Sequence, residues 1–166
     1  ENGYLIKAVL KDNSIFTSLA NKFKKEIDKI SLDDLKKIGG YNAGNLNIAP
    51  GIMGSEIYDV VKNINFENFF YSLVGEKIDN YTVTIGGNLN LPNSSPQLFH
   101  TDGYWTPKMF ILNIATSTID SNNGPMEVYE KSHKYFLPYW KFLFKKSRFK
   151  KKKILLKPGE VLFREH

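Results

Sequence analysis

Apolar side chains recur at helical spacing through the first part of the chain. Between residues 14 and 38 they lie three or four positions apart, which is the pattern of an amphipathic helix. The members of this stripe are Ile15, Leu19, Phe23, Ile27 and Ile30. Ser31 and the aspartates that follow it predict an N-cap inside this stretch. Residues 52–74 predict one or two further helices, with a break near residue 64 and an end at Gly75.

At residue 81 the pattern changes, because residues 81–85 alternate with the period of a β-strand and further short apolar runs follow. These runs are rich in β-branched and aromatic residues, and turns containing Gly, Asn and Pro separate them. Together with one earlier segment, we expect strands at residues 46–49, 81–85, 98–101, 109–116, 126–129, 153–156 and 161–163. Helices followed by many short strands predict an α+β fold with a sandwich or jelly roll as its core.

Composition limits the size and class of the protein. A chain of 166 residues with 42% hydrophobic residues is long enough for one domain with a buried core. We expect a single domain, with residues 1–80 as a helical approach region and residues 81–166 as the sheet core. The absence of cysteine excludes disulfides and thiolate metal sites, so metal ligands must be His, Asp or Glu. No apolar run reaches membrane-spanning length and no signal peptide is visible, so we expect a cytoplasmic protein without a membrane partner.

The net charge of +6 comes from one segment. Residues 141–157 contain nine Lys or Arg and no acid, whereas the rest of the chain has 14 basic and 17 acidic residues. Such a segment could attract a polyanion or steer an anionic substrate. A solvated Lys-rich helix or loop is the favoured interpretation, because lysine is seldom buried. The aromatic residues in and before this segment are expected to anchor it, and nucleic acid is disfavoured as a partner.

His100 and Asp102 form the most informative short pattern in the sequence. In an extended segment residues i and i+2 point the same way, so an imidazole and a carboxylate would project into one space. One further histidine would complete the 2-His-1-carboxylate triad of non-haem Fe(II) oxygenases, which leaves coordination positions open. Taken alone the pair is a weak signal, because a His and an Asp two residues apart occur often by chance.

Three motifs in a fixed order give this pair a context. The first is PQLFHTDG at residues 96–103, the second is NNGPMEV at 122–128 continuing to KSHK at 131–134, and the third is KPGEVLF at 157–163. Together they resemble the phytanoyl-CoA dioxygenase (PhyH-like) family of Fe(II)- and 2-oxoglutarate-dependent oxygenases. In that family an HxD pair is followed by a strand, an NGP turn that ends in SH, and a PGD turn leading to a distal histidine. The likeness covers residues 81–166, and the first half of the chain matches only loosely.

The resemblance implies a double-stranded β-helix, a jelly roll (cupin-like) fold that holds a metal in its mouth. It implies that His100 and Asp102 bind Fe(II), with 2-oxoglutarate as cosubstrate. The implied partners are O₂ and a small organic substrate that the dioxygenase hydroxylates. Related halogenating enzymes have a small residue in place of the carboxylate, so the presence of Asp102 favours hydroxylation.

Five other residues are weaker candidates. Asn113 lies within an apolar strand, where it either faces the cosubstrate or is satisfied by backbone groups. Gln97 either approaches the metal site or is an ordinary surface residue. Tyr104 and Trp105 line the substrate mouth or simply pack, and His133 is expected at a structural turn rather than at the metal.

The third iron ligand is either His166 or a histidine beyond it. In the family the distal histidine lies further past the PGD turn than His166 lies past Gly159, and an arginine that binds 2-oxoglutarate comes later still. We therefore interpret the sequence as truncated at both ends, and most clearly at its C-terminus. The alternative function is a non-catalytic jelly-roll module that binds a ligand or partner without a complete iron site. The sequence specifies neither the substrate nor the oligomeric state.

Overall fold

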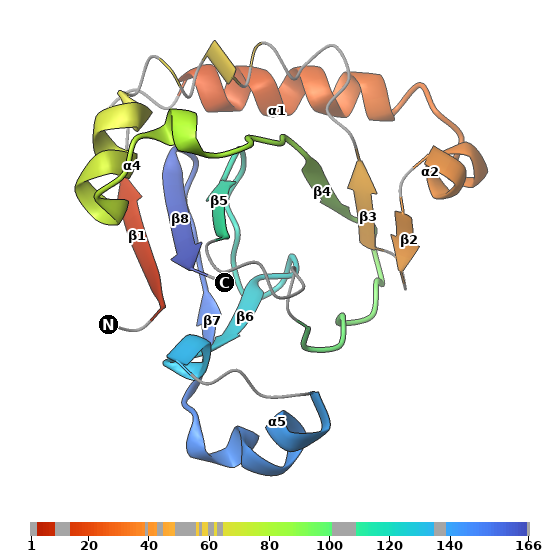
Figure 1. Cartoon of the computed structure of the whole chain (residues 1–166). Helices are drawn as coiled ribbons and strands as arrows, with labels where there is room; N and C mark the ends of the chain where they lie inside the picture. The colour runs from red at the N-terminus through yellow and green to blue at the C-terminus, as the bar shows by residue number, and fades with distance from the viewer. Residues whose placement is uncertain are drawn as a thin grey trace. The chain divides into compact units, whose positions relative to one another are not determined.

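The computed structural model divides the chain into two compact units. The first unit is Glu1–Ala20 together with Leu98–His166, and the second is Asn21–Gln97 (Figure 1). The structure describes residues 3–8, 14–38, 40–42, 45–48, 56, 58–59, 62, 65–100, 109–134 and 139–165.

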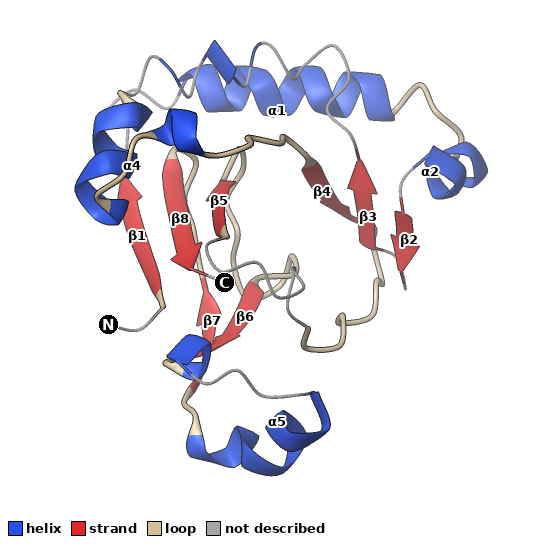
Figure 2. Cartoon of the chain, viewed as in Figure 1, coloured by secondary structure: helices blue, strands red, loops and turns tan. Residues whose placement is uncertain are grey.

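Helices and small antiparallel sheets make up both units, so the α+β class predicted from the sequence is confirmed (Figure 2). None of the helices in the described ranges combines the length and the apolar character needed to span a bilayer. The elements are β1 (Tyr4–Ala8), α1 (Ser14–Ile27), α2 (Leu32–Ile38), β2 (Gly40–Asn42), β3 (Asn45–Ile48), α4 (Phe66–Val74), η1 (Ile78–Asn80), β4 (Gly87–Asn90), β5 (Phe110–Ile114), β6 (Met126–Tyr129), η2 (Ser132–Lys134), α5 (Tyr139–Lys145), η3 (Lys146–Arg148), β7 (Lys151–Ile154) and β8 (Glu160–Glu165).

An antiparallel sheet of order β1-β8-β5 forms the centre of the first unit. Its central strand β8 contains three consecutive buried residues, Val161, Leu162 and Phe163. Leu162 belongs to a core with Ile154 and Leu156, and the two-stranded sheet β6-β7 supplies side chains to the same core. A side chain such as Leu162 contributes about 1.5–3 kcal/mol when it is fully removed from water.

Strands β5 and β8 continue toward β6 and β7 as one antiparallel ribbon. An isolated bridge joins Ile119 to Leu156, and the next ladder begins where Met126 pairs with Ile154. Six residues lie between Ile119 and Met126 but only one lies between Ile154 and Leu156, so the first strand carries five extra residues. They lie within residues 120–125, a segment that includes the turn predicted from the sequence at residues 122–125.

Two glycines allow the turns of this ribbon. Gly124 has a φ of 80° and Gly159 a φ of 82°, both in the left-handed region where a side chain is strained. The turn before Gly124 is closed by the Asn123 side chain, which accepts a hydrogen bond from the Asp120 N–H (2.8 Å). At the other turn, the Gly159 N–H donates to the Ala115 carbonyl (3.0 Å). Both turns therefore agree with the roles that the sequence gives to these glycines.

The second unit is built around the antiparallel sheet β2-β3-β4. Leu46 of β3 is 1% exposed and forms a core with Leu35 of α2. Phe23 and Ile27, on the last turns of α1, pack against this core. The predicted cap of α2 is present, because the Asp34 N–H donates to the Ser31 hydroxyl oxygen (3.2 Å).

Helix α4 also begins and ends as the sequence predicts. The residue before it, Asn65, has a φ of 56°, and Gly75 after it has a φ of 75°. The Gly75 N–H donates to the Tyr71 carbonyl (2.8 Å), which satisfies one carbonyl of the last turn.

Several predicted element positions are wrong. Residues 81–85 form no strand, because no neighbouring strand pairs with them, and β4 begins instead at Gly87, where the strand was expected to end. Leu98–His100, the described part of the strand predicted at 98–101, is also outside any ladder. The strand predicted at 153–156 starts earlier, at Lys151.

Two further differences concern the N-terminal part of the chain. Strand β1 was not predicted, and it completes the central sheet by pairing with β8. On α1, Phe16 is buried whereas Ile15 is 39% exposed, so the apolar stripe begins one residue later than the spacing suggests.

Candidate functional site

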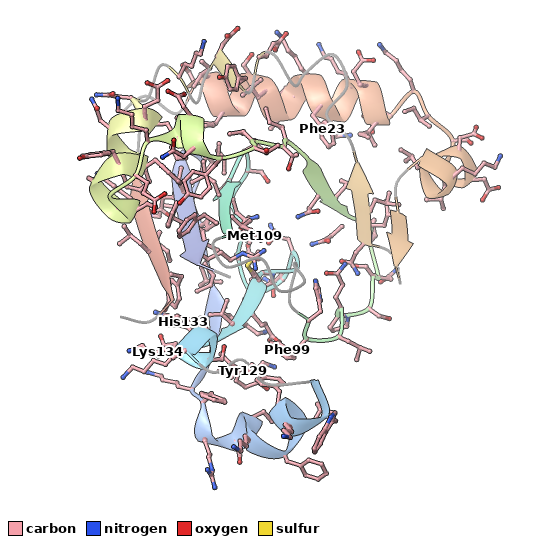
Figure 3. All side chains as sticks on the ribbon, in the orientation of Figure 1. Phe23, Phe99, Met109, Tyr129, His133 and Lys134 are labelled. Atoms are coloured by element: carbon pink, nitrogen blue, oxygen red, sulfur yellow. The ribbon has the colours of Figure 1, made fainter. Side chains whose placement is uncertain are left out.

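The backbone next to His100 is held by an aromatic cluster. The ring centroid of Phe99 lies 4.5 Å from that of Tyr129 on β6 and 6.4 Å from that of Phe142 on α5. Lys151 places its ammonium group 5.4 Å from the centre of the Phe99 ring. Figure 3 shows Phe99 and Tyr129 close together at this end of the unit. Because Phe99 precedes His100 directly, its packing restrains the position of the histidine.

His100 itself is exposed and makes a short hydrogen bond to the backbone. Its Nδ1 lies 2.7 Å from the carbonyl oxygen of Leu98. A carbonyl oxygen can only accept, so Nδ1 donates the proton of this hydrogen bond. Metal-binding histidines commonly donate one ring N–H to a carbonyl and coordinate with the other nitrogen. The hydrogen bond of His100 to the Leu98 carbonyl is therefore of the kind that metal-binding histidines make.

The other ligands expected from the sequence lie outside the described residues. These are Asp102 and His166, and the same holds for Tyr104 and Trp105. Across the ranges that the structure describes, no three His, Asp or Glu side chains come together as a metal site.

Asn113 lies on the face of the central sheet that packs toward β6 and β7. In the ladder between β5 and β8, Asn113 pairs with the fully buried Leu162, and paired residues project from the same face. This face packs against β6 and β7, because Met126 and Val128 contact the core around Leu162. Asn113 therefore lies on the face of the sheet that carries the buried Leu162.

Arg164 is the partner of Asn113. It follows Leu162 by two residues on β8, so it lies on the same face. Its Nε donates a hydrogen bond to Asn113 Oδ1 (3.3 Å). A half-buried guanidinium beside a side-chain amide is a chemical environment that suits a carboxylate. Sequence analysis missed this residue, although its spacing from a buried leucine places it inward.

A second polar group lies beside Arg164 on the same face. Tyr4 of β1 pairs directly with Arg164, and its hydroxyl donates to Glu130 Oε1 (2.8 Å). Lys152 of β7 lies 3.9 Å from the same carboxylate oxygen. Hydrogen bonding to Tyr4 and, to a lesser degree, the charge of Glu130 raise the pKa of the Lys152 ammonium. We call Tyr4, Asn113, Glu130, Lys152 and Arg164 the inner polar cluster.

The remaining candidates are not part of this cluster. Gln97 is exposed and is the last residue of the second unit. His133 lies on η2, where its ring packs against Gly3, whose φ is 88°. A Cβ atom at Gly3 would overlap His133 Nδ1. This position agrees with the structural role predicted for His133.

Comparison with known proteins adds nothing to this geometry. No family model, no curated protein and no solved structure matches the chain.

Proposed function

We propose that this chain belongs to an Fe(II)- and 2-oxoglutarate-dependent dioxygenase that hydroxylates a small organic substrate. The observation that carries the proposal is the hydrogen bond from His100 Nδ1 to the Leu98 carbonyl. It orients the imidazole in a segment where the sequence has an HxD motif, as such hydrogen bonds to carbonyl groups do for metal-binding histidines.

The strand pairing supports a double-stranded β-helix of the phytanoyl-CoA dioxygenase type. A jelly roll is a long antiparallel ribbon folded so that its halves lie in two facing sheets. Here β5 pairs with β8 in one sheet, and β6 pairs with β7 in another. The two pairs share the core around Leu162, as the halves of such a ribbon do.

The residues of the chain fit the proposed ligands by their chemistry. His100 Nε2 and the Asp102 carboxylate would hold Fe(II), with His166 or a later histidine as the third ligand. Bound iron with 2-oxoglutarate supplies the activation of O₂. Asn113 and Arg164 offer an amide and a guanidinium for a carboxylate of the cosubstrate, and the apolar side chains around Leu162 pack on the same face of the sheet.

Anaerobic absorption spectroscopy tests the proposal. Fe(II) and 2-oxoglutarate, added together, are expected to give a weak visible charge-transfer band with this chain or with the polypeptide continued past His166. His100→Ala should abolish the band, whereas His133→Ala, the matched change at a histidine against Gly3, should leave it. If a folded polypeptide continued past His166 gives no band, the enzyme proposal is wrong and the non-catalytic binding module becomes the better hypothesis.

A further inference from the structure

Helix α5 presents a row of apolar side chains to solvent. Trp140, Leu143 and Phe144 are 58%, 40% and 83% exposed. Their spacing of i, i+3 and i+4 places them on one face of the helix. Large exposed side chains that gather on one face indicate an interaction site more strongly than single ones do.

The opposite face of α5 is fixed to the first unit. Phe142 packs edge-on against Tyr129 (5.1 Å between ring centroids) and stacks on Phe149 (6.3 Å). Phe99 contacts both Phe142 and Tyr129. The aromatic cluster therefore holds the helix in place, and the apolar row faces solvent from an anchored helix.

Basic residues surround this apolar row. Lys141 and Lys145 lie on α5 and Lys146 follows directly, and all three are exposed. Two lysines on the strand β7, in contrast, form ion pairs. Lys151 pairs with Glu127 (2.7 Å) and Lys152 lies 3.9 Å from Glu130. Within the described ranges, no ion pair engages the three lysines of α5 and η3. We call Trp140, Leu143 and Phe144, together with Lys141, Lys145 and Lys146, the α5 tip.

We propose that the α5 tip docks on the surface of an anionic lipid bilayer. Trp, Leu and Phe side chains enter the interfacial region of a membrane, and flanking lysines remain among the headgroups, where they attract anionic lipids. Charge complementarity supports this occupant, because residues 141–157 carry nine basic residues and no acid. We expected no membrane partner because no apolar run in the sequence is long enough to span a bilayer. Docking on the surface of a bilayer does not require such a run.

Other partners fit the α5 tip less well. Three apolar side chains on seven helical residues cover far less area than the roughly 800 Å² per partner of a stable protein interface. Nucleic-acid bases stack on flat aromatic faces, whereas Leu143 occupies the row between Trp140 and Phe144.

Vesicle co-sedimentation of the full chain tests the proposal. The chain is expected to sediment with phosphatidylcholine vesicles that contain phosphatidylserine and to remain in solution with phosphatidylcholine alone. Replacing Lys141, Lys145 and Lys146 by Gln should weaken binding about 100-fold. Replacing Trp140 and Phe144 by Ser should weaken it about tenfold or more.

Matched variants control for general changes in charge and exposed apolar surface. Replacing the exposed Lys25, Lys77 and Lys134 by Gln, or the exposed Tyr71 and Val83 by Ser, should change binding less than about twofold. All the substituted side chains are exposed, so each variant should melt with the wild-type circular dichroism profile.

Vesicle binding that is absent in the wild type, or equal in the tip and control variants, overturns the proposal. So does tighter, tip-dependent binding of an oligothymidylate than of the anionic vesicles, which would make the α5 tip a nucleic-acid site.

Discussion

Arg164 Nε donates a hydrogen bond to Asn113 Oδ1 at 3.3 Å, which joins β8 to β5 across the inner face of their sheet. Both residues flank Leu162, the most deeply buried side chain of β8. A cation and an amide that lie next to an apolar core are costly to place there unless they are satisfied by each other or by a ligand. The pair is therefore the most informative part of the inner polar cluster.

Asn113→Ala is expected to lower the free energy of unfolding by about 1–2 kcal/mol, because Arg164 loses a partner for a half-buried charge. If the pair binds a carboxylate of 2-oxoglutarate, Arg164→Gln should weaken 2-oxoglutarate binding to the iron-loaded protein about tenfold or more. Urea unfolding measures the first effect and calorimetric titration the second. Unchanged 2-oxoglutarate affinity in Arg164→Gln would leave the pair with a structural role only.

Phe99→Ala is expected to weaken divalent-metal binding, because Phe99 fixes the backbone next to His100 through its contact with Tyr129. The loss of ring packing should also lower the unfolding free energy by about 1–2 kcal/mol, since Phe99 is only half-buried. Phe144→Ala is the matched control, because Phe144 is 83% exposed and lies in the same unit. Equal metal affinity in the two variants would contradict a positioning role for Phe99.

Gly3→Ala should lower the free energy of unfolding by about 2–3 kcal/mol. The new Cβ overlaps the His133 ring, and a φ of 88° is strained for any residue with a side chain. Combining it with His133→Ala should recover the part of the loss that is due to the overlap, whereas the backbone strain remains. A double-mutant cycle in urea measures this coupling, and strict additivity would show that β1 does not pack on η2 as described.

The cap of α2 should stabilise the second unit in a pH-dependent way. The Ser31 hydroxyl, and then Lys37, lower the pKa of the Asp34 carboxyl below its ordinary value of 3.8. A carboxyl whose pKa is lower in the folded state stabilises the protein above its unfolded pKa, and this contribution is lost as pH falls through the folded pKa. Asp34→Asn should therefore be less stable than wild type at neutral pH, and the difference should shrink as pH falls below 3.8 and vanish once the pH is below the lowered pKa of Asp34. Thermal melts across this range measure the difference, and a gap that persists in acid would contradict it.

Local patterns predicted much of the fold. The stop at Gly75, the cap at Ser31, and the turns at Gly124 and Gly159 each depend on the backbone preference of one or two residues, and each is present. The α+β class and the strand at residues 126–129 follow from periodicity alone. These features are encoded within a few residues of one another.

Features that depend on distant partners could not be predicted. Residues 81–85 have the composition of a strand, but a ladder needs a neighbour, and β3 pairs with residues 87–90 instead. β1 is short, and its partner β8 lies more than 150 residues away. Tyr4 and Glu130 of the inner polar cluster were missed for the same reason, whereas Arg164 could have been inferred from its spacing to Leu162.

The central claim is that His100 binds a metal through Nε2, and nitrogen-15 NMR of the histidine rings tests it most directly. Zn(II), a diamagnetic substitute for Fe(II), is titrated into the labelled protein. The account predicts that the Nε2 resonance of His100 shifts on titration while its Nδ1 stays protonated, and that His133 does not respond. A His100 ring that is unaffected by Zn(II), or one that coordinates through Nδ1, would contradict the account.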